Sequence, residues 1–268
     1  MLRASVWLTA AVSTILALSI ASADAAGHKH AGIPAYVTAA VADPARPDAD
    51  KKVDAERKPA ETLAFSHVKP GDSVAELMPG GGYFTRMLSA LVGPSGHVYA
   101  IVPPPMPPMP PRPGMRMRMD MGAAAKAIAA DPHYSNVTVL TTLGTDNYGL
   151  PGPVDLVWTT DNYHDFHNGP HADIAAFNKL VFDSLKPGGI FLVVDHAGAA
   201  GTDDTQTSTL HRIDPASARK EIEAAGFKLV AHSNALRNPK DPHTARIFDA
   251  SIRGHTDKFM YRFVKPAA

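Results

Sequence analysis

The sequence has no cysteine among its 268 residues, which excludes disulfide bonds and thiolate metal centres. A chain of this length can bury a core large enough to be stable without such cross-links. It also has no excess of charge, because 26 basic and 26 acidic residues cancel, so no general positive field exists to hold nucleic acid or an anionic membrane. After the first 20 residues it has no long apolar run. We therefore expect no nucleic-acid partner and no membrane span once a signal is removed.

The amino-terminal segment has the features of a secretion signal. Arg3 gives a positively charged start, residues 6–20 are apolar apart from Thr and Ser, and small residues follow at Ala21-Ser22-Ala23 and Ala23-Asp24-Ala25. We therefore predict that residues 1–25 are a signal peptide, and that the protein is periplasmic or secreted.

A glycine-rich turn organises the rest of the chain. Residues 74–77 form an apolar run that carries Glu76 near its end, as in a buried parallel strand. Pro79-Gly80-Gly81-Gly82 follows as a turn with little side chain, and apolar residues then recur at helical spacing over residues 84–91. A strand, a glycine turn and a helix begin a nucleotide-binding α/β unit, in which the glycines let the backbone approach a ligand.

Strands and helices alternate through the main domain. We predict an α/β fold, a Rossmann-like doubly wound sheet of seven strands that is mostly parallel with an antiparallel last strand, preceded by N-terminal helices. The expected strands are residues 74–77, 97–102, 136–140, 154–159, 190–194, 227–231 and 258–264. The expected helices are residues 33–42, 48–63, 84–91, 122–130, 172–185 and 215–225, with Asp48 and Asp214 as caps. The expected parts of the chain are the signal peptide at 1–25, a tail with helices at 26–66, and the main domain at 67–268.

Polar residues follow the expected strands at their carboxyl ends, where open parallel sheets bind ligands. Glu76 ends the first strand, the run from Thr160 to His167 follows the fourth, and Asp195-His196 ends the fifth. The run His211-Arg212-Ile213-Asp214 comes soon after. Buried strands that end in such runs are difficult to explain by packing alone, because each polar group needs a partner. We therefore predict a ligand site at this edge.

These features resemble the class I S-adenosylmethionine-dependent methyltransferases. The resemblance rests on Glu76 with Gly80 and Gly82, on the Lys186-Pro187-Gly188-Gly189 turn before the fifth strand, and on the antiparallel last strand. The motifs Asn162-Tyr163-His164-Asp165 and His211-Arg212-Ile213-Asp214 look most like those of exported predicted bacterial methyltransferases. The resemblance implies S-adenosylmethionine as cofactor and methyl transfer to an acceptor, which we expect to be a small molecule.

The resemblance also implies roles for individual residues. Those implied in cofactor binding are Glu76, Pro79, Gly80, Gly81, Gly82, Tyr83, Asp146, Thr160 and Asp161. Asp146 would contact the adenine, and His164 would act as general base with Asp165 beside it and Asn162 near the acceptor. The alternative that His164 is a hydrogen-bonded structural residue at a strand end stays open. Two positions depart from the family's pattern, because Met78 replaces the first glycine of the turn and Val102 stands where an acid usually holds the ribose. Met78 either narrows the cofactor site or points into the core.

A second hypothesis is an exported methyltransferase-like binding protein without catalysis, which binds a soft metal such as copper. It rests on the Pro/Met-rich insertion at residues 103–121, where thioethers at Met115, Met117, Met119 and Met121 suit Cu(I). A loosely packed surface loop explains the same residues. The 13 histidines are scattered without a metal-site spacing, so the sequence assigns no metal ligands. The sequence does not indicate the oligomeric state.

Overall fold

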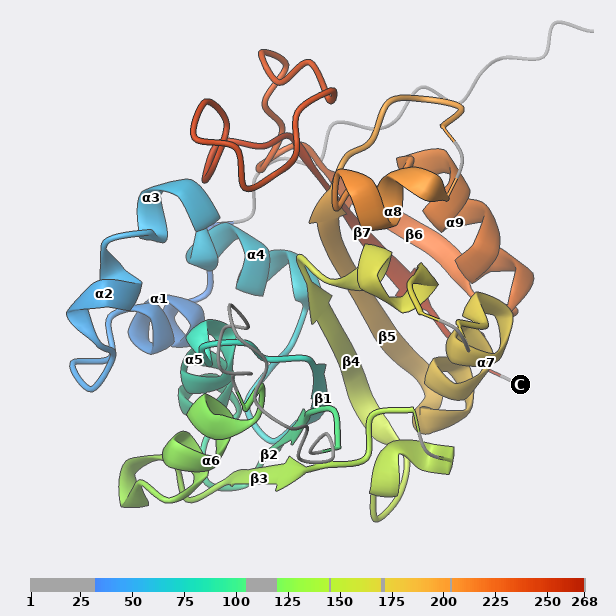
Figure 1. Ribbon diagram of the computed structural model, residues 1–268. Helices are drawn as coiled ribbons and strands as arrows, with labels where there is room; N and C mark the ends of the chain where they lie inside the picture. The colour runs from blue at the N-terminus through green and yellow to red at the C-terminus, as the bar shows by residue number, and fades with distance from the viewer. Residues whose placement is uncertain (1–31, 105–119, 145, 170–171, 203, 268) are drawn as a thin grey trace, which may run out of the picture. The chain divides into compact units, whose positions relative to one another are not determined.

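The computed structural model describes residues 32–104, 120–144, 146–169, 172–202 and 204–267 (Figure 1). All the helices and strands below belong to one compact unit, Ile33–Ala268. The signal peptide and most of the Pro/Met-rich insertion lie outside the described residues, as does the side chain of Asp146. Among the described residues, none of the helices has both the length and the hydrophobicity that crossing a bilayer requires.

A seven-stranded sheet forms the centre of this unit, in the order β3-β2-β1-β4-β5-β7-β6. Its strands are β1 (Ser73–Leu77), β2 (His97–Ile101), β3 (Val137–Leu140), β4 (Val154–Thr160), β5 (Leu185–His196), β6 (Lys228–Ser233) and β7 (Lys258–Val264). The first five strands run parallel, and β7 lies antiparallel between β5 and β6. The predicted fold class is confirmed, including the antiparallel last strand.

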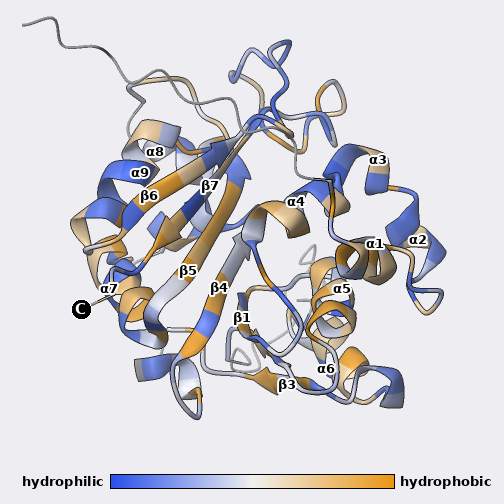
Figure 2. Cartoon of the chain, turned by 180° about the vertical axis from the view of Figure 1, so that it is seen from behind, coloured by the Kyte–Doolittle hydropathy of each residue, from blue (hydrophilic) through white to orange (hydrophobic). Residues whose placement is uncertain are grey.

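Helices cover both faces of the sheet (Figure 1). Side chains alternate along each strand, so Leu156 and Trp158 of β4 join one apolar cluster and Val157 joins the other. Helices α1 (Ala35–Val41), α5 (Tyr83–Val92) and α6 (Ala123–Ala129) contribute to the first cluster, and α7 (Ile174–Ser184) and α9 (Pro215–Ala224) to the second. Figure 2 shows the apolar residues concentrated along the central strands, as two covered faces require.

The predicted single helix at residues 48–63 is wrong. The segment forms three short helices, α2 (Asp48–Lys51), α3 (Asp54–Arg57) and α4 (Pro59–Ser66). Lys58 adopts a left-handed conformation with φ 43°, and Pro59 then begins α4. A residue before proline is disfavoured in the α region, and proline suits the first helical position, so the chain breaks there. Asp48 is the first residue of α2, after Pro47, and makes no side-chain cap.

The boundaries near the fifth strand also differ from the prediction. The Lys186-Pro187-Gly188-Gly189 segment belongs to β5, which begins at Leu185 rather than at residue 190. The pairing with β4 shifts between Val154 and Leu156, and Gly188 has φ 78°, so the expected turn is an irregularity within the strand. Asp214 caps α9 by accepting a hydrogen bond from the Ala216 amide, as predicted. The short elements η1 (Pro132–Tyr134), η2 (Asp146–Gly149), η3 (Tyr163–His167) and α8 (Thr205–Thr209) were not predicted.

Candidate active site

The glycine turn after β1 presents open backbone at the carboxyl edge of the sheet. Met78, Gly80 and Gly82 all have positive φ, at 49°, 57° and 77°. The Gly82 amide donates to the Pro79 carbonyl at 2.9 Å and closes the turn. A Cβ added at Gly80 or Gly81 would have no atom within 4 Å, which leaves room for a ligand to approach the backbone there.

Glu76 lies beneath this turn and faces the interior. Its side chain is only 2% exposed, and one carboxylate oxygen accepts a hydrogen bond from the Thr85 hydroxyl at 2.6 Å. Burial raises the pKa of Glu76 to about 7, against the opposing effects of Thr85, Arg57 and Arg86. The resemblance implied Glu76 in cofactor binding, and in the structure its carboxyl group is buried and bonded to Thr85.

Asn162 ties the end of β4 to the end of β1. Its amide nitrogen donates to the carbonyl oxygens of Leu77 at 3.1 Å and Met78 at 3.2 Å, and its amide oxygen accepts from the Thr159 hydroxyl. Asn162 is buried and its amide group is fully engaged in these contacts. Its side chain therefore holds the glycine turn in place, rather than reaching toward a reacting group.

Asp161 connects three parts of the fold at the same edge. Its carboxylate lies 2.8 Å from the Lys258 ammonium of β7 and 3.2 Å from the Arg57 guanidinium of α3. Burial would raise the pKa of Asp161, but Lys258, His196 and Arg57 together hold it far below its usual range. Asp161 also has φ 61°, an uncommon conformation for a non-glycine residue that often marks a functional site.

Tyr83 and Thr160 lie beside these groups. The Tyr83 hydroxyl donates to Asp54 at 2.7 Å, and the Arg57 guanidinium lies 4.4 Å from the centre of the Tyr83 ring. These contacts join α3 to α5. Because Tyr83 is buried, it has little surface to offer a cofactor. Thr160 is half-buried at the end of β4.

A cavity of about 620 Å³ opens where β1 to β4 end. Its wall includes Met78, Pro103, Leu143, Tyr148 and Asp165, from the segments that follow those strands. Two further wall residues, Phe166 and Phe177, have stacked rings whose centres are 4.0 Å apart. Met78 thus borders the cavity, as expected if it narrows the cofactor site and does not point into the core. The volume and the flat apolar walls suit a small organic ligand.

His164 is the most constrained titratable group at this edge. It is 1% exposed, and its Nδ1 lies 2.8 Å and 3.0 Å from the two carboxylate oxygens of Asp195. Asp195 is completely buried and also accepts from the backbone amides of His164 at 2.6 Å and His196 at 2.7 Å. Because a carboxylate accepts, His164 carries a proton on Nδ1, and Nε2 points away from Asp195. Burial would lower the pKa of His164, but the Asp195 charge outweighs it and the pKa is raised.

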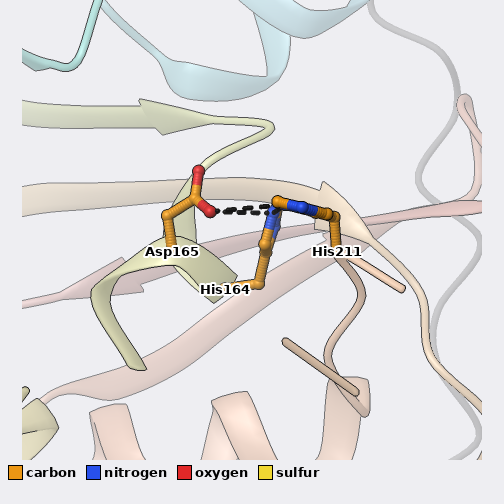
Figure 3. A group of neighbouring side chains, drawn as sticks. All are labelled: His164, Asp165 and His211. Carbon is orange, nitrogen blue, oxygen red and sulfur yellow. Dashed lines mark hydrogen bonds and ion pairs between the residues drawn. The ribbon is translucent and has the colours of Figure 1, made fainter. Parts of the chain in front are cut away.

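Nε2 of His164 faces two further polar side chains (Figure 3). It lies 3.4 Å from an oxygen of Asp165 and 3.3 Å from Nδ1 of His211, and these two atoms are 3.5 Å apart. His211 has φ 56°, and burial together with the neighbouring His164 lowers its pKa. His164, Asp165 and His211 are close enough for one atom from each to hold a metal ion.

The Asn162-Tyr163-His164-Asp165 motif predicts that His164 acts with Asp165, whereas the structure also brings Asp195 and His211 to His164. Both belonged to the polar runs at the strand ends. The signal that could have joined Asp195 to His164 is the strand order of the fold, since β4 and β5 are neighbours and residues after their ends must meet. His211 follows a loop whose path the sequence does not specify.

Comparison with known proteins gives one curated relative and many similar structures. No family model matches the chain. Protein-L-isoaspartate O-methyltransferase of Ignicoccus hospitalis is 28% identical over 145 residues, which cover 54% of this chain and 57% of that protein. The match therefore spans little more than half of the relative.

Solved structures share the fold over most of the chain. A SAM-dependent methyltransferase from Aquifex aeolicus superimposes with a TM-score of 0.53 and 17% identity, covering 82% of this chain and 98% of the other. The cyclase SpnF superimposes with a TM-score of 0.53 and 16% identity, covering 82% of each chain. The chain thus has the fold of the class I S-adenosylmethionine-dependent methyltransferases. This fold also serves a cyclase, so the fold alone does not identify the reaction.

Proposed function

We propose that the protein is an S-adenosylmethionine-dependent methyltransferase that acts on a small-molecule acceptor. The observation that carries the proposal is the open glycine turn beside a cavity with flat apolar walls, at the carboxyl edge of a methyltransferase fold. The methyltransferase of Ignicoccus hospitalis, with 28% identity, supports the reaction class.

The residues present fit the cofactor in two places. The backbone of Gly80 and Gly81 has space for the methionine part, and Phe166 and Phe177 offer a stacked aromatic wall for a purine. Val102 is buried at the end of β2, where a carboxylate would be needed to hold ribose hydroxyls. We therefore expect the sugar to be held less firmly than the two ends of the molecule.

The acceptor is assigned to the group formed by His164, Asp165 and His211. S-adenosylmethionine, when bound, would supply an electrophilic methyl group, whose bond to sulfur would break as the acceptor's lone pair forms the new bond. The acceptor also loses a proton. As general base, His164 would take it on the Nε2 lone pair, which the Asp195 hydrogen bond directs toward Asp165 and His211. Asn162 contributes by fixing the turn, and the remaining work is to align donor and acceptor.

Isothermal titration of the protein with S-adenosylmethionine, and with its demethylated product, tests the cofactor assignment. Gly81→Leu would fill the open face of the turn and is expected to abolish binding. Gly152→Leu is the matched control, because Gly152 also has no atom within 4 Å of an added Cβ but precedes β4 at the opposite end of the strand. Absence of binding to the parent protein at millimolar ligand would refute the proposal.

We also propose that the protein is exported, on the strength of the apolar run at residues 6–20. The mass of the chain recovered from a periplasmic fraction tests this, since removal of residues 1–25 would leave a chain that starts at Ala26. The alternative of a copper-binding protein without catalysis rests on Met115 to Met121. Met115, Met117 and Met119 lie outside the described residues, and the comparisons do not favour that alternative.

A further inference from the structure

Three potential ligand atoms meet at separations that are long for hydrogen bonds. Nε2 of His164, an oxygen of Asp165 and Nδ1 of His211 are separated by 3.3, 3.4 and 3.5 Å. Good hydrogen bonds to nitrogen or oxygen span about 2.7–3.2 Å, so all three separations are long for direct contacts. His167 and Glu221 behave differently, since their nitrogen and oxygen are 2.9 Å apart and form an ordinary pair.

We propose that His164, Asp165 and His211 bind a divalent metal ion of the zinc type, in a four-coordinate site with one open position. Zinc bonds of about 2.0–2.1 Å place tetrahedral ligand atoms about 3.3–3.4 Å apart, whereas octahedral ligands at the same bond length lie about 2.8–3.0 Å apart. The three separations in the structure agree with the tetrahedral arrangement. Two imidazoles and one carboxylate are a common ligand set for catalytic zinc, with a water or substrate in the fourth position.

The surroundings of His164 match those of a metal ligand. A histidine that binds a metal through one nitrogen usually donates the other N–H to a carboxylate or carbonyl, which fixes the ring. Asp195 receives Nδ1–H of His164 at 2.8 Å and is itself completely buried. Asp165 and His211 have side chains that are 34% and 22% exposed, so an ion can reach the group from solvent.

Arg246 is the group that opposes metal binding. Its guanidinium nitrogen lies 3.2 Å from Nε2 of His211. A guanidinium only donates, so this contact puts the His211 proton on Nδ1, the nitrogen that the metal would need. The contact is solvent-exposed, so Arg246 can turn away at little cost. Metal binding therefore requires His211 to change tautomer and to give up this contact.

The metal would define how the acceptor is activated, an inference that rests on the proposed methyl transfer. An acceptor hydroxyl or thiol in the open position would bind the ion, and its proton would pass to solvent before the methyl group is transferred. Coordination would then replace proton transfer to His164, because the Nε2 lone pair cannot serve both purposes. The metal site also places the acceptor beside Asp165, which borders the cavity assigned to the cofactor.

Isothermal titration of the full chain with Zn(II) tests the site. Asp165→Ala and His211→Gln are each expected to lose one tightly bound equivalent that the parent protein holds. His255→Gln is the matched control, because His255 is exposed and belongs to neither group of potential metal ligands among the described residues. Zinc bound elsewhere remains in all four proteins, so the difference between them is the result. Equal binding by all four would overturn the proposal.

Three further measurements extend the test. Arg246→Glu replaces the opposing donor with an acceptor for His211 Nε2–H, so it is expected to bind zinc about 10-fold more tightly or better. Weaker binding in Arg246→Glu would contradict the inference. Co(II) in place of zinc should give the intense visible absorption of a four-coordinate ion. Titration of zinc-free protein with S-adenosylmethionine separates the two proposals, since each ligand can bind while the other fails.

Discussion

The buried carboxyl group of Glu76 gives the protein a specific dependence of stability on pH. Its pKa is about 7 in the folded chain, against a usual value of 4.5. The folded state therefore holds a proton that the unfolded state releases between these two values. The free energy of unfolding should fall as the pH rises from 4.5 to about 7 and then level off. The difference between the two pKa values corresponds to about 3 kcal/mol.

Glu76→Gln isolates this effect, because glutamine has the shape of the neutral acid and its amide oxygen can still accept from Thr85. The variant should match the parent near pH 4.5 and exceed it by about 3 kcal/mol at pH 8. Urea unfolding followed by circular dichroism at pH 4.5, 6 and 8 measures the difference. Glu61→Gln on α4 makes the same change of charge at an exposed position, and its effect should not vary with pH. A parent protein that gains stability over Glu76→Gln as the pH rises would refute the reasoning.

The same variant tests the role of Glu76 toward the cofactor. S-adenosylmethionine carries a sulfonium and an ammonium group, and a cation near Glu76 favours the ionised carboxyl. The affinity of S-adenosylmethionine for the parent protein should therefore rise from pH 6 to pH 8, by up to about tenfold per pH unit below the pKa of Glu76. Glu76→Gln should show no such rise in titration calorimetry. Equal pH dependence in both proteins would remove Glu76 from the cofactor site.

Lys258→Met should lower the free energy of unfolding by about 1–3 kcal/mol at pH 7, because Asp161 then loses its closest cation and keeps Arg57 at 3.2 Å. The low pKa of Asp161 stabilises the fold above pH 3.8, and this contribution disappears as the pH falls further. The destabilisation by Lys258→Met should therefore shrink when urea unfolding is measured in acid; the same destabilisation at every pH would contradict this. Met78→Gly should change the free energy of unfolding by less than about 1 kcal/mol, because glycine relieves the strain of the left-handed conformation but adds freedom to the unfolded chain. The same variant enlarges the cavity and should bind the cofactor more tightly in calorimetry. Weaker cofactor binding would show that the thioether is a contact and not an obstruction. Gly82→Ala should destabilise the chain more than Gly80→Ala in the same urea assay. A Cβ at Gly82 would lie 2.1 Å from a side-chain carbon of α6, whereas a Cβ at Gly80 has no atom within 4 Å. Equal destabilisation by the two variants would refute this.

Regular local patterns account for the parts of the fold that were predicted correctly. The apolar run at residues 190–194 and the alternation over residues 258–264 predicted buried strands, and both lie in the sheet. The N-terminal helices agree less well with the prediction, because apolar spacing over residues 48–63 indicates one helix where the structure has three. Pro59, with the left-handed Lys58 before it, divides the segment.

The sequence by itself determined the strand and helix order and the glycine turn, and it placed polar residues at the carboxyl edge. These properties depend on neighbours within a few residues, where spacing and turn chemistry act directly. Only the tertiary structure decided which of those polar residues meet. His164 and His211 are 47 positions apart, and Asp195 reaches His164 only because β4 and β5 are adjacent. The left-handed Met78, Asp161 and His211 depend on the same packing, because a local preference alone would not hold them there.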